Sequence, residues 1–529
     1  MDPPSPPSKG GSLKKVPKLT TKYLSLSAFI CVHLRFKQMT NNKHSKTWKR
    51  IALICLTILL VITFRPLTAA ETPKHYTDLE FPPLREVELP EYHRYQLDNG
   101  MVVYLMPDRK LPLISGRAIV RTGSRWEPGE KAGLADLVGI VMRSGGTEQH
   151  TPDQLNEMLE RRAATVETSL GTTSGGANFS ALSEDLETVF KLFAEVLRFP
   201  AFDREQLELA KTQLEGNIAR RNDDPGDIAG REFQKLIYGA ESPYARTIEY
   251  QSLANISRED LINFYRQYFH PERIILGIVG DFETEEMKEL IEAEFGDWEP
   301  SSNPEKNILP TVSKQQQKSG IFFVDQPQLT QSNILLGHLG DKLDNPDYPA
   351  LSVLNGVLNG FAGRLFNEVR SRQGLAYSVY GSWSPRYDYP GVFIAGGQTR
   401  SDATVAFIKA VLGEIKKLQT TPISEAELAY AKESILNSFV FNFQKPSQSL
   451  GRLMRYEYYG YPADFLYRYQ RGVKETTIED VQRVANEYLQ PDEMVTLVVG
   501  NKQEIQPPLR DLGWEVKIVD VSIPEPKNS

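Results

Sequence analysis

Hydrophobic and polar residues alternate along this chain in two recurring patterns. Between residues 186 and 197 six apolar residues lie three or four positions apart, which predicts a helix with one apolar face. Met101–Leu105 is a short apolar run of the kind that forms a strand. Because strands and long helices mix throughout the chain, we predict an α+β fold.

The pattern repeats at an offset of 220 residues. Residues 260–280 and 480–500 each contain an Asp, a Tyr, a Pro and an apolar run that ends at Gly, all in the same order. Each copy predicts an amphipathic helix that ends near the proline and is followed by a buried strand. We therefore expect two homologous halves, residues 71–298 and 321–505.

Two polar segments bound the second half. Residues 299–320 are rich in Pro, Ser, Asn, Gln and Lys and poor in apolar side chains, so we predict a linker. Residues 506–529 are expected to form a C-terminal tail.

Residues 1–70 have the composition of a leader. A basic stretch at 46–50 precedes an apolar run at 51–64 and small residues at 68–70, which is the pattern of a secretory signal. The run is short for a membrane span, so an uncleaved anchor is the weaker alternative. We expect translation to begin at Met39 and the protein to be exported, to a periplasm first, with a lumen or the cell exterior as alternatives.

Removing the leader changes the charge and the cysteine content. The remaining residues include 49 basic and 67 acidic side chains, a net charge of −18, which argues against binding to nucleic acid. Cys31 and Cys55 both precede the predicted cleavage site. The exported body should therefore contain no disulfide and no thiol chemistry.

Several short motifs resemble landmarks of one peptidase family. They are Leu97-Asp98-Asn99-Gly100, Arg121-Thr122-Gly123-Ser124, Gly145-Gly146-Thr147 and Asn222-Asp223-Asp224-Pro225. In content and order they are similar to the pitrilysin family of zinc peptidases, which includes insulin-degrading enzymes and mitochondrial processing peptidases. The resemblance spans residues 90–505. It implies that each half is a sheet covered by helices and that the halves face each other across a chamber.

The family's metal motif has lost its working residues here. Zinc peptidases of this kind use H-x-x-E-H, because two histidines four apart on a helix bind zinc and the glutamate acts as general base. By this alignment Asp136, Gly139 and Ile140 stand at those three positions, and Asn217 stands where a third, glutamate ligand would be. We therefore predict that this chain holds no zinc and no other cofactor.

A second motif of the family is retained. The segment from Arg364 to Gly381 resembles the one that presents an arginine and a tyrosine seven residues apart, here Arg370 and Tyr377. In the family this pair lies opposite the zinc and contacts the scissile peptide group, where both side chains stabilise negative charge on oxygen. The structural alternative is that Arg370 pairs with Glu368 and Tyr377 fills core.

Two neighbouring features have simpler interpretations. Asn359–Gly363 contains two glycines and is expected to be a structural turn, with contact to substrate backbone as the alternative. The tyrosine-rich segment 455–461 is expected to pack in a core rather than to line a peptide-binding wall.

Three functional hypotheses remain. In the first, the chain pairs with a zinc-bearing homologue and supplies Arg370 and Tyr377 to peptide hydrolysis, so that neither subunit is efficient alone. In the second, it is a non-catalytic peptide-binding or structural subunit of a larger assembly. The third, a peptidase that acts alone through another site, is weakest, because we find no nucleophile motif and no clustered histidines.

Overall fold

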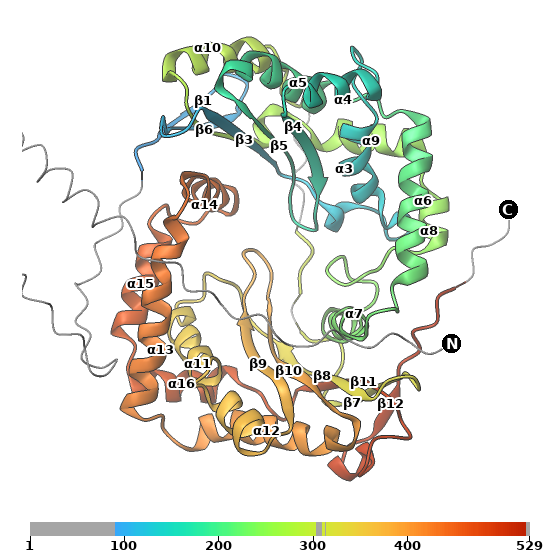
Figure 1. Ribbon diagram of the computed structural model, residues 1–529, viewed down its shortest axis with the longest axis vertical. Helices are drawn as coiled ribbons and strands as arrows, with labels where there is room; N and C mark the ends of the chain where they lie inside the picture. The colour runs from blue at the N-terminus through green and yellow to red at the C-terminus, as the bar shows by residue number, and fades with distance from the viewer. Residues whose placement is uncertain (1–89, 303–308, 313, 525–529) are drawn as a thin grey trace, which may run out of the picture. The chain divides into compact units, whose positions relative to one another are not determined.

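The computed structural model describes residues 90–302, 309–312 and 314–524. They form two halves, each a six-stranded sheet with helices packed against it (Figure 1). The predicted α+β fold and its division into two halves are confirmed. The leader, Met39 and both cysteines lie outside the described residues. Within the described ranges, no helix combines the length and apolarity that crossing a membrane requires.

The first sheet has the strand order β1-β2-β6-β3-β5-β4. β2 and β6 run parallel, and the other neighbouring strands run antiparallel. The central strand β6 is buried along its whole length, because its alternate side chains enter two separate apolar cores. The strands are β1 (His93–Gln96), β2 (Val102–Pro107), β3 (Leu113–Val120), β4 (Thr165–Leu170), β5 (Gly175–Leu182) and β6 (Ile274–Gly280).

The helices of the first half follow the apolar periodicity of the sequence. The predicted apolar face over residues 186–197 is confirmed as the buried side of α5, where Val189, Phe190 and Phe193 have no exposed surface. The helices are α3 (Leu134–Ser144), α4 (Pro152–Glu160), α5 (Leu186–Arg198), α6 (Arg204–Arg220), α7 (Pro225–Tyr238), α8 (Tyr250–Ala254), α9 (Arg258–Tyr268) and α10 (Thr284–Phe295).

The second sheet has the order β12-β7-β11-β8-β10-β9. Its strands are β7 (Gly320–Asp325), β8 (Gln331–Leu339), β9 (Ala376–Ser384), β10 (Val392–Arg400), β11 (Val495–Gly500) and β12 (Val516–Ile518). The longer helices of this half are α11 (Tyr348–Leu358), the π-helix η6 (Phe366–Arg372), α12 (Thr404–Thr420), α13 (Glu425–Ser438), α14 (Pro446–Tyr459), α15 (Phe465–Glu475) and α16 (Ile478–Tyr488).

Five strands of each sheet share one topology, and the sixth differs, because β1 pairs antiparallel with β2 whereas β12 pairs parallel with β7. The order β2-β6-β3-β5-β4 in the first corresponds to β7-β11-β8-β10-β9 in the second, and both contain one parallel pair at the same place. A capping box formed by Ser257 and Asp260 opens α9, and one formed by Thr477 and Asp480 opens α16. These caps are again 220 residues apart, so the sequence repeat marks a repeated structure.

Each half contributes one helix to the other half's sheet. α7 packs on β8 and β11 of the second sheet, and α14 packs on β2, β3 and β6 of the first. Phe233 of α7 is fully buried there, and Met454 of α14 is 1% exposed. Burying large apolar side chains stabilises a fold by about 1.5–3 kcal/mol each. Neither sheet therefore completes its core with its own half alone.

Polar contacts, one of them a buried charge pair, join the halves as well. Arg125 Nη1 lies 2.5 Å from Asp388 Oδ2, and these side chains are only 3% and 14% exposed. Glu457 of α14 accepts hydrogen bonds from Arg94 and from the Tyr104 hydroxyl, both of the first half. Charge pairs buried in this way require their partners, so they fix how the two halves pack.

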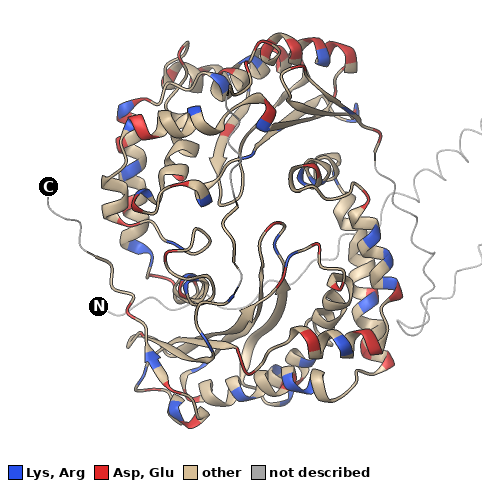
Figure 2. Cartoon of the chain, turned by 180° about the vertical axis from the view of Figure 1, so that it is seen from behind, with Lys and Arg blue, Asp and Glu red and all other residues tan. Residues whose placement is uncertain are grey.

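Charged residues are found mainly on the helices, where basic and acidic residues are mixed (Figure 2). Several form pairs one turn apart, such as Arg161 with Glu157 and Arg468 with Asp464. Exposed pairs of this kind contribute little to stability. The apolar cores therefore carry most of the stability of the fold.

The predicted linker and tail both contribute to the folded structure. β7 begins at Gly320, and the backbone amides of Gln316 and Gln317 donate to carbonyls at the end of α7. In the predicted tail, β12 pairs with β7 and Leu509 is buried. A three-residue strand has no alternation that a sequence pattern could reveal, so the pattern of residues 506–529 predicts only a tail.

Candidate functional site

Arg370 lies on η6, a seven-residue π-helix. Leu365 and Val369 are fully buried and anchor η6 in the second core. Just before it, Arg364 Nε donates to Glu427 Oε1 of α13 at 2.6 Å. π-helical turns are rare in proteins and are frequent at functional sites, because they alter which side chains one turn presents.

Glu368 does not pair with Arg370. Its carboxylate accepts hydrogen bonds from Arg372 and Gln373, and the Arg372 guanidinium holds the pKa of Glu368 below its ordinary value. Among the described residues, the Arg370 guanidinium makes no hydrogen bond and no ion pair. The structural alternative for Arg370 is therefore wrong, and its donors are available to a ligand.

Tyr377 lies in a β-bulge near the start of β9. Ala376 pairs with Thr399 and Ser378 with Gln398, so Tyr377 is an extra residue on its strand. A bulge of this kind redirects a side chain away from the regular pleat. The Tyr377 side chain is 83% exposed, which excludes the alternative that it fills core.

The structure brings Arg370 and Tyr377 into contact. The Arg370 guanidinium carbon lies 4.8 Å from the Tyr377 ring centroid and 4.8 Å from that of Phe366. Phe361, which is 79% exposed, packs edge-on against Phe366 with centroids 5.2 Å apart. We call Phe361, Phe366, Arg370 and Tyr377 the arginine–tyrosine patch. Its two rings hold the guanidinium by cation–π contacts.

The predicted turn at Asn359–Gly363 is confirmed, and it also positions Phe361. Asn359 is fixed to β9, because its side chain accepts a hydrogen bond from the Gly381 amide at 2.9 Å and donates to the Gly381 carbonyl. The turn thereby presents Phe361 to solvent. The sequence pattern did not indicate a functional role for Phe361 or Phe366. The available signal was a large apolar residue between two glycines in a tight turn.

The arginine–tyrosine patch combines donors with aromatic surface. A guanidinium and a phenol can donate hydrogen bonds to one carbonyl or carboxylate oxygen, and the flanking rings can pack against apolar side chains. Such a surface can bind and polarise a peptide group. It offers no thiol, imidazole or carboxylate that could act as nucleophile or base, so it does not complete a hydrolytic site by itself.

The four degenerate metal positions lie on α3 and α6. Asp136 is in the first turn of α3, Gly139 is buried, Ile140 packs partly against the first core, and Asn217 is exposed on α6. Burial raises the pKa of Asp136, which weakens it further as an anionic ligand. Among the described residues, no group of three or more His, Cys, Asp or Glu side chains could hold a metal ion.

The packing at Gly139 also excludes the lost glutamate. A Cβ atom built on Gly139 would lie 2.6 Å from the backbone nitrogen of Leu170 in β4 and 3.1 Å from Ser169 backbone atoms. A Cβ contact of 2.6 Å with backbone is essentially never seen, so a side chain at position 139 would require α3 or β4 to shift. The residues present therefore do not fit a zinc site.

A buried carboxylate caps the N-terminus of α3. Glu127 is 6% exposed, and its two oxygens accept hydrogen bonds from the amides of Gly133 and Ala135 at 3.2 and 2.8 Å. Burial raises the pKa of Glu127 to about 7 despite these donors, and the nearby Asp136 adds to the shift. This end of α3 is thus sensitive to pH near neutrality.

The tyrosine-rich segment 455–461 is a packing element, as expected. Tyr456 and Tyr458 are 4% and 5% exposed, and the Tyr458 hydroxyl donates to the Thr173 carbonyl of the first half at 2.5 Å. The Tyr459 ring stacks on Tyr387 with centroids 4.6 Å apart. These tyrosines join the two halves and do not form an open wall.

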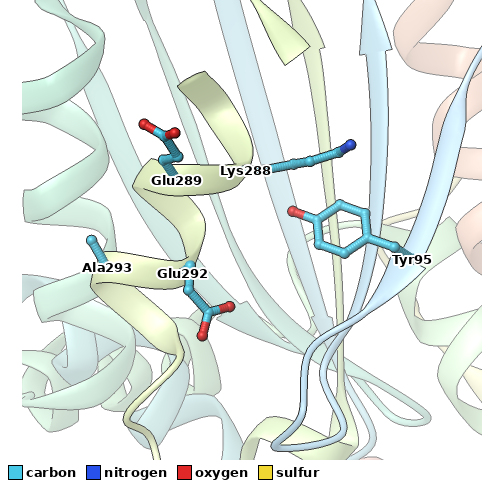
Figure 3. A pocket seen from close by; sticks show the side chains of 5 residues that line it. All are labelled: Tyr95, Lys288, Glu289, Glu292 and Ala293. Carbon is cyan, nitrogen blue, oxygen red and sulfur yellow. The ribbon is translucent and has the colours of Figure 1, made fainter. Parts of the chain in front are cut away.

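A surface groove lies between β1 and α10 in the first half. It is lined by Tyr95, Lys288, Glu289, Glu292 and Ala293 (Figure 3). Burial raises the pKa of Tyr95, whose hydroxyl has no hydrogen-bond partner among the described residues. The groove shares no residue with the arginine–tyrosine patch, and its charged side chains form no catalytic arrangement.

Two protein-family models match this chain. Residues 115–242 match the model described as insulinase, peptidase family M16, and residues 255–435 match the model described as peptidase M16 inactive domain. The second match contains Arg370 and Tyr377, and the first contains all four degenerate metal positions.

Similar proteins include both peptidases and a non-peptidase. The uncharacterised zinc protease YmxG of Bacillus subtilis is 23% identical over 68% of this chain and 86% of its own length. The non-peptidase homologue YmxG of Helicobacter pylori is 21% identical over 73% of this chain and 88% of its own length. A crystal structure of a peptidase M16 inactive domain from Pseudomonas fluorescens has a TM-score of 0.70 and 25% identity, and the match covers 78% of this chain and 98% of that one.

Proposed function

Because this chain belongs to the M16 peptidase family, we propose that it is a zinc-less subunit that acts together with a zinc-bearing homologue. In this proposal the homologue supplies the metal and the general base. This chain supplies Arg370 and Tyr377 to the hydrolysis of a peptide bond. An unfolded peptide is the proposed substrate.

One observation carries the proposal. A π-helix and a β-bulge bring the half-buried Arg370 and the exposed Tyr377 into contact, although the metal site of the same chain is closed at Gly139. Rare backbone features persist when the positions they create are useful. A chain that kept only its fold would have no need of an arginine without ion-pair partners beside an exposed tyrosine.

The chemistry follows from the charge that forms during the reaction. Attack on a peptide carbonyl places negative charge on its oxygen, and preorganised donors stabilise that charge more than the neutral carbonyl. The Arg370 guanidinium already contacts two rings, which favour its position before the charge develops. Removing one such donor typically lowers the rate about 10²–10³-fold.

A second candidate is a subunit that binds peptides or scaffolds an assembly without catalysis. The name of the Helicobacter pylori relative, a non-peptidase homologue, favours this alternative. It predicts that substitutions at Arg370 and Tyr377 leave the turnover of any complex unchanged.

Reconstitution tests the proposal. The chain is mixed with a homologue from the same organism that has an intact H-x-x-E-H motif, and cleavage of a quenched fluorescent peptide is measured for each chain alone and for the pair. We expect activity from the pair only. Arg370→Ala and Tyr377→Phe should each lower kcat of the pair about 10²-fold while co-elution of the two chains is unchanged.

Two matched variants control this experiment. Arg372→Ala removes a neighbouring arginine that is already paired with Glu368, and Tyr95→Phe removes a hydroxyl in the distant groove. Both should retain full activity. Full activity of the Arg370→Ala pair would refute the catalytic role, and cleavage by this chain alone would refute the division of labour.

The compartment is part of the same proposal. The predicted leader would place the pair outside the cytoplasm, in the periplasm first. Fractionation of cells that express the full chain, with N-terminal sequencing of the mature protein, tests both the export and the predicted start at Met39.

A further inference from the structure

The outer edge of β9 is only partly covered. β9 is the last strand of its sheet and pairs with β10 on one side only. On the other side, side chains of α11 and the following turn bind its backbone. Asn355 Oδ1 accepts a hydrogen bond from the Trp383 amide at 3.1 Å, and Asn359 binds both backbone groups of Gly381.

Val379 continues this edge, and its side chain packs partly against the second core while its backbone is not bound by α11 or the turn that follows it. The amide and carbonyl of one strand residue point to the same edge, and those of the next residue point to the opposite edge. Because Gly381 and Trp383 face outward, Val379 does so too, and the ladder between residues 378 and 384 is regular. Among the described residues, neither the amide nor the carbonyl of Val379 has a partner outside the sheet.

The first half closes the equivalent position. Val166 occupies in β4 the place that Val379 occupies in β9, and its carbonyl accepts a hydrogen bond from Arg143 Nε of α3 at 2.7 Å. Asn359 occupies in the second half the place that Arg143 occupies in the first. Its side chain is shorter and binds Gly381 instead of Val379. Gly139 brings α3 against Leu170, and the equivalent Trp383 of β9 is bound by Asn355, so the two edges differ at Val166 and Val379.

We propose that the open edge of β9 at Val379 binds an extended peptide segment by strand addition. The inference rests on the proposed function, because the segment is taken to be the peptide that reaches Arg370 and Tyr377. Backbone groups at a sheet edge supply affinity that does not depend on sequence, and alternate side chains of the guest supply selectivity.

The neighbouring side chains favour an apolar or aromatic guest. Tyr377 and Tyr380 are 83% and 41% exposed on this strand, and Phe361 lies in the adjacent patch. Since Gly381 and Trp383 are already covered, the guest can pair only along the beginning of β9. It would therefore place its backbone beside Arg370 and Tyr377.

A variant pair tests the edge in the isolated chain. The probe is a fluorescein-labelled, unstructured ten-residue peptide with alternating apolar and polar residues, and binding is measured by fluorescence anisotropy. Val379→Pro removes the outward amide, which an edge strand tolerates, and Val379→Ala shortens the side chain but keeps the amide. We expect about tenfold weaker binding for Val379→Pro and a change of less than twofold for Val379→Ala. Equal affinities of these two variants would overturn the proposal.

A second measurement does not depend on how a variant folds. The same peptide is N-methylated at alternate residues, in one phase or in the other, and bound to the unaltered chain. Strand addition requires that one phase abolish binding and that the other be tolerated, because only one edge of the guest faces β9. If both phases bind equally, strand addition at this edge is wrong.

The outcomes separate this inference from the proposed function. Loss of peptide binding in Val379→Pro, together with no cleavage by the reconstituted pair of unaltered chains, would support the edge and refute the catalytic division. Unchanged peptide binding in Val379→Pro, with activity that depends on Arg370, would support the catalytic division and refute the edge.

Discussion

Replacing Gly139 by alanine tests whether the lost metal site is physically closed. Within a helix, Gly→Ala normally stabilises a protein by up to about 1 kcal/mol, because alanine loses less backbone freedom on folding. At Gly139 the added methyl group would meet the backbone of β4, 2.6 Å from the Leu170 nitrogen. We therefore expect the opposite sign.

The magnitude follows from what can move. The obstacle is backbone and not the end of a flexible side chain, so α3 or β4 has to shift. Arg143 holds α3 to the Val166 carbonyl, and Thr168 donates to the Gly139 carbonyl at 2.6 Å. Overpacking in such a setting costs about 1–3 kcal/mol, and near the upper end when nothing yields. Subtracting the gain in helix propensity leaves a net destabilisation of about 2 kcal/mol.

The assay is equilibrium unfolding in urea at constant pH, with Gly413→Ala as the matched control. Gly413 lies in the middle of α12, and a methyl group there would meet nothing within 4 Å. We expect Gly413→Ala to raise the free energy of unfolding by about 0.5–1 kcal/mol and Gly139→Ala to lower it. Changes of opposite sign in the free energy of unfolding for these two Gly→Ala substitutions would show that position 139 has no room for a methyl group.

If Gly139→Ala stabilises the protein as much as Gly413→Ala does, then α3 and β4 have room for a side chain. The geometric argument against a metal site in the first half would then fail, and only the chemistry of Asp136, Ile140 and Asn217 would remain against it.

Two further predictions concern buried charges. Burial raises the pKa of Glu127 to about 7, so the folded protein keeps a proton that the unfolded chain releases above about pH 4.5. This difference contributes about 3 kcal/mol to the free energy of unfolding below pH 4.5, and the contribution is lost as the pH rises through 7. Urea unfolding at pH 5 and pH 8 should show a smaller loss of stability in Glu127→Gln than in the unaltered protein, and equal losses would contradict the assignment. Asp388→Ala should lower the free energy of unfolding by about 3–5 kcal/mol, because it leaves the buried Arg125 without its partner. The double variant Arg125→Met with Asp388→Leu should recover most of that loss in the same assay, and a double variant as unstable as Asp388→Ala would show that the charge pair is not the cause.

The repeat and the local signals were sufficient to predict much of the fold. The 220-residue offset between residues 260–280 and 480–500 predicted the two halves, which the matching strand orders confirm. The sequence could not show that α7 packs on the second sheet and α14 on the first. Both helices have ordinary apolar faces, and such a face does not indicate which surface it covers. The predicted chamber between the halves stays a prediction.

Part of the candidate site could also be predicted from the sequence, and part could not. The spacing of Arg370 and Tyr377 was visible in the sequence, and so was the absence of zinc ligands at Asp136, Gly139 and Ile140. The catalytic role of Arg370 and Tyr377, the zinc-bearing partner and the export stay predictions. The bulge at Tyr377 was hidden, because a one-residue shift in register depends on which strand lies opposite.

The sequence by itself determined the two halves, the missing metal ligands and the presence of the arginine and tyrosine, since each is a matter of residue type and local periodicity. Only the tertiary structure decided that Arg370 is free of Glu368, that Gly139 closes against β4 and that Val379 is open where Val166 is covered. These outcomes depend on distances between segments far apart in the chain, where a difference of about one side chain's length decides which backbone group is reached.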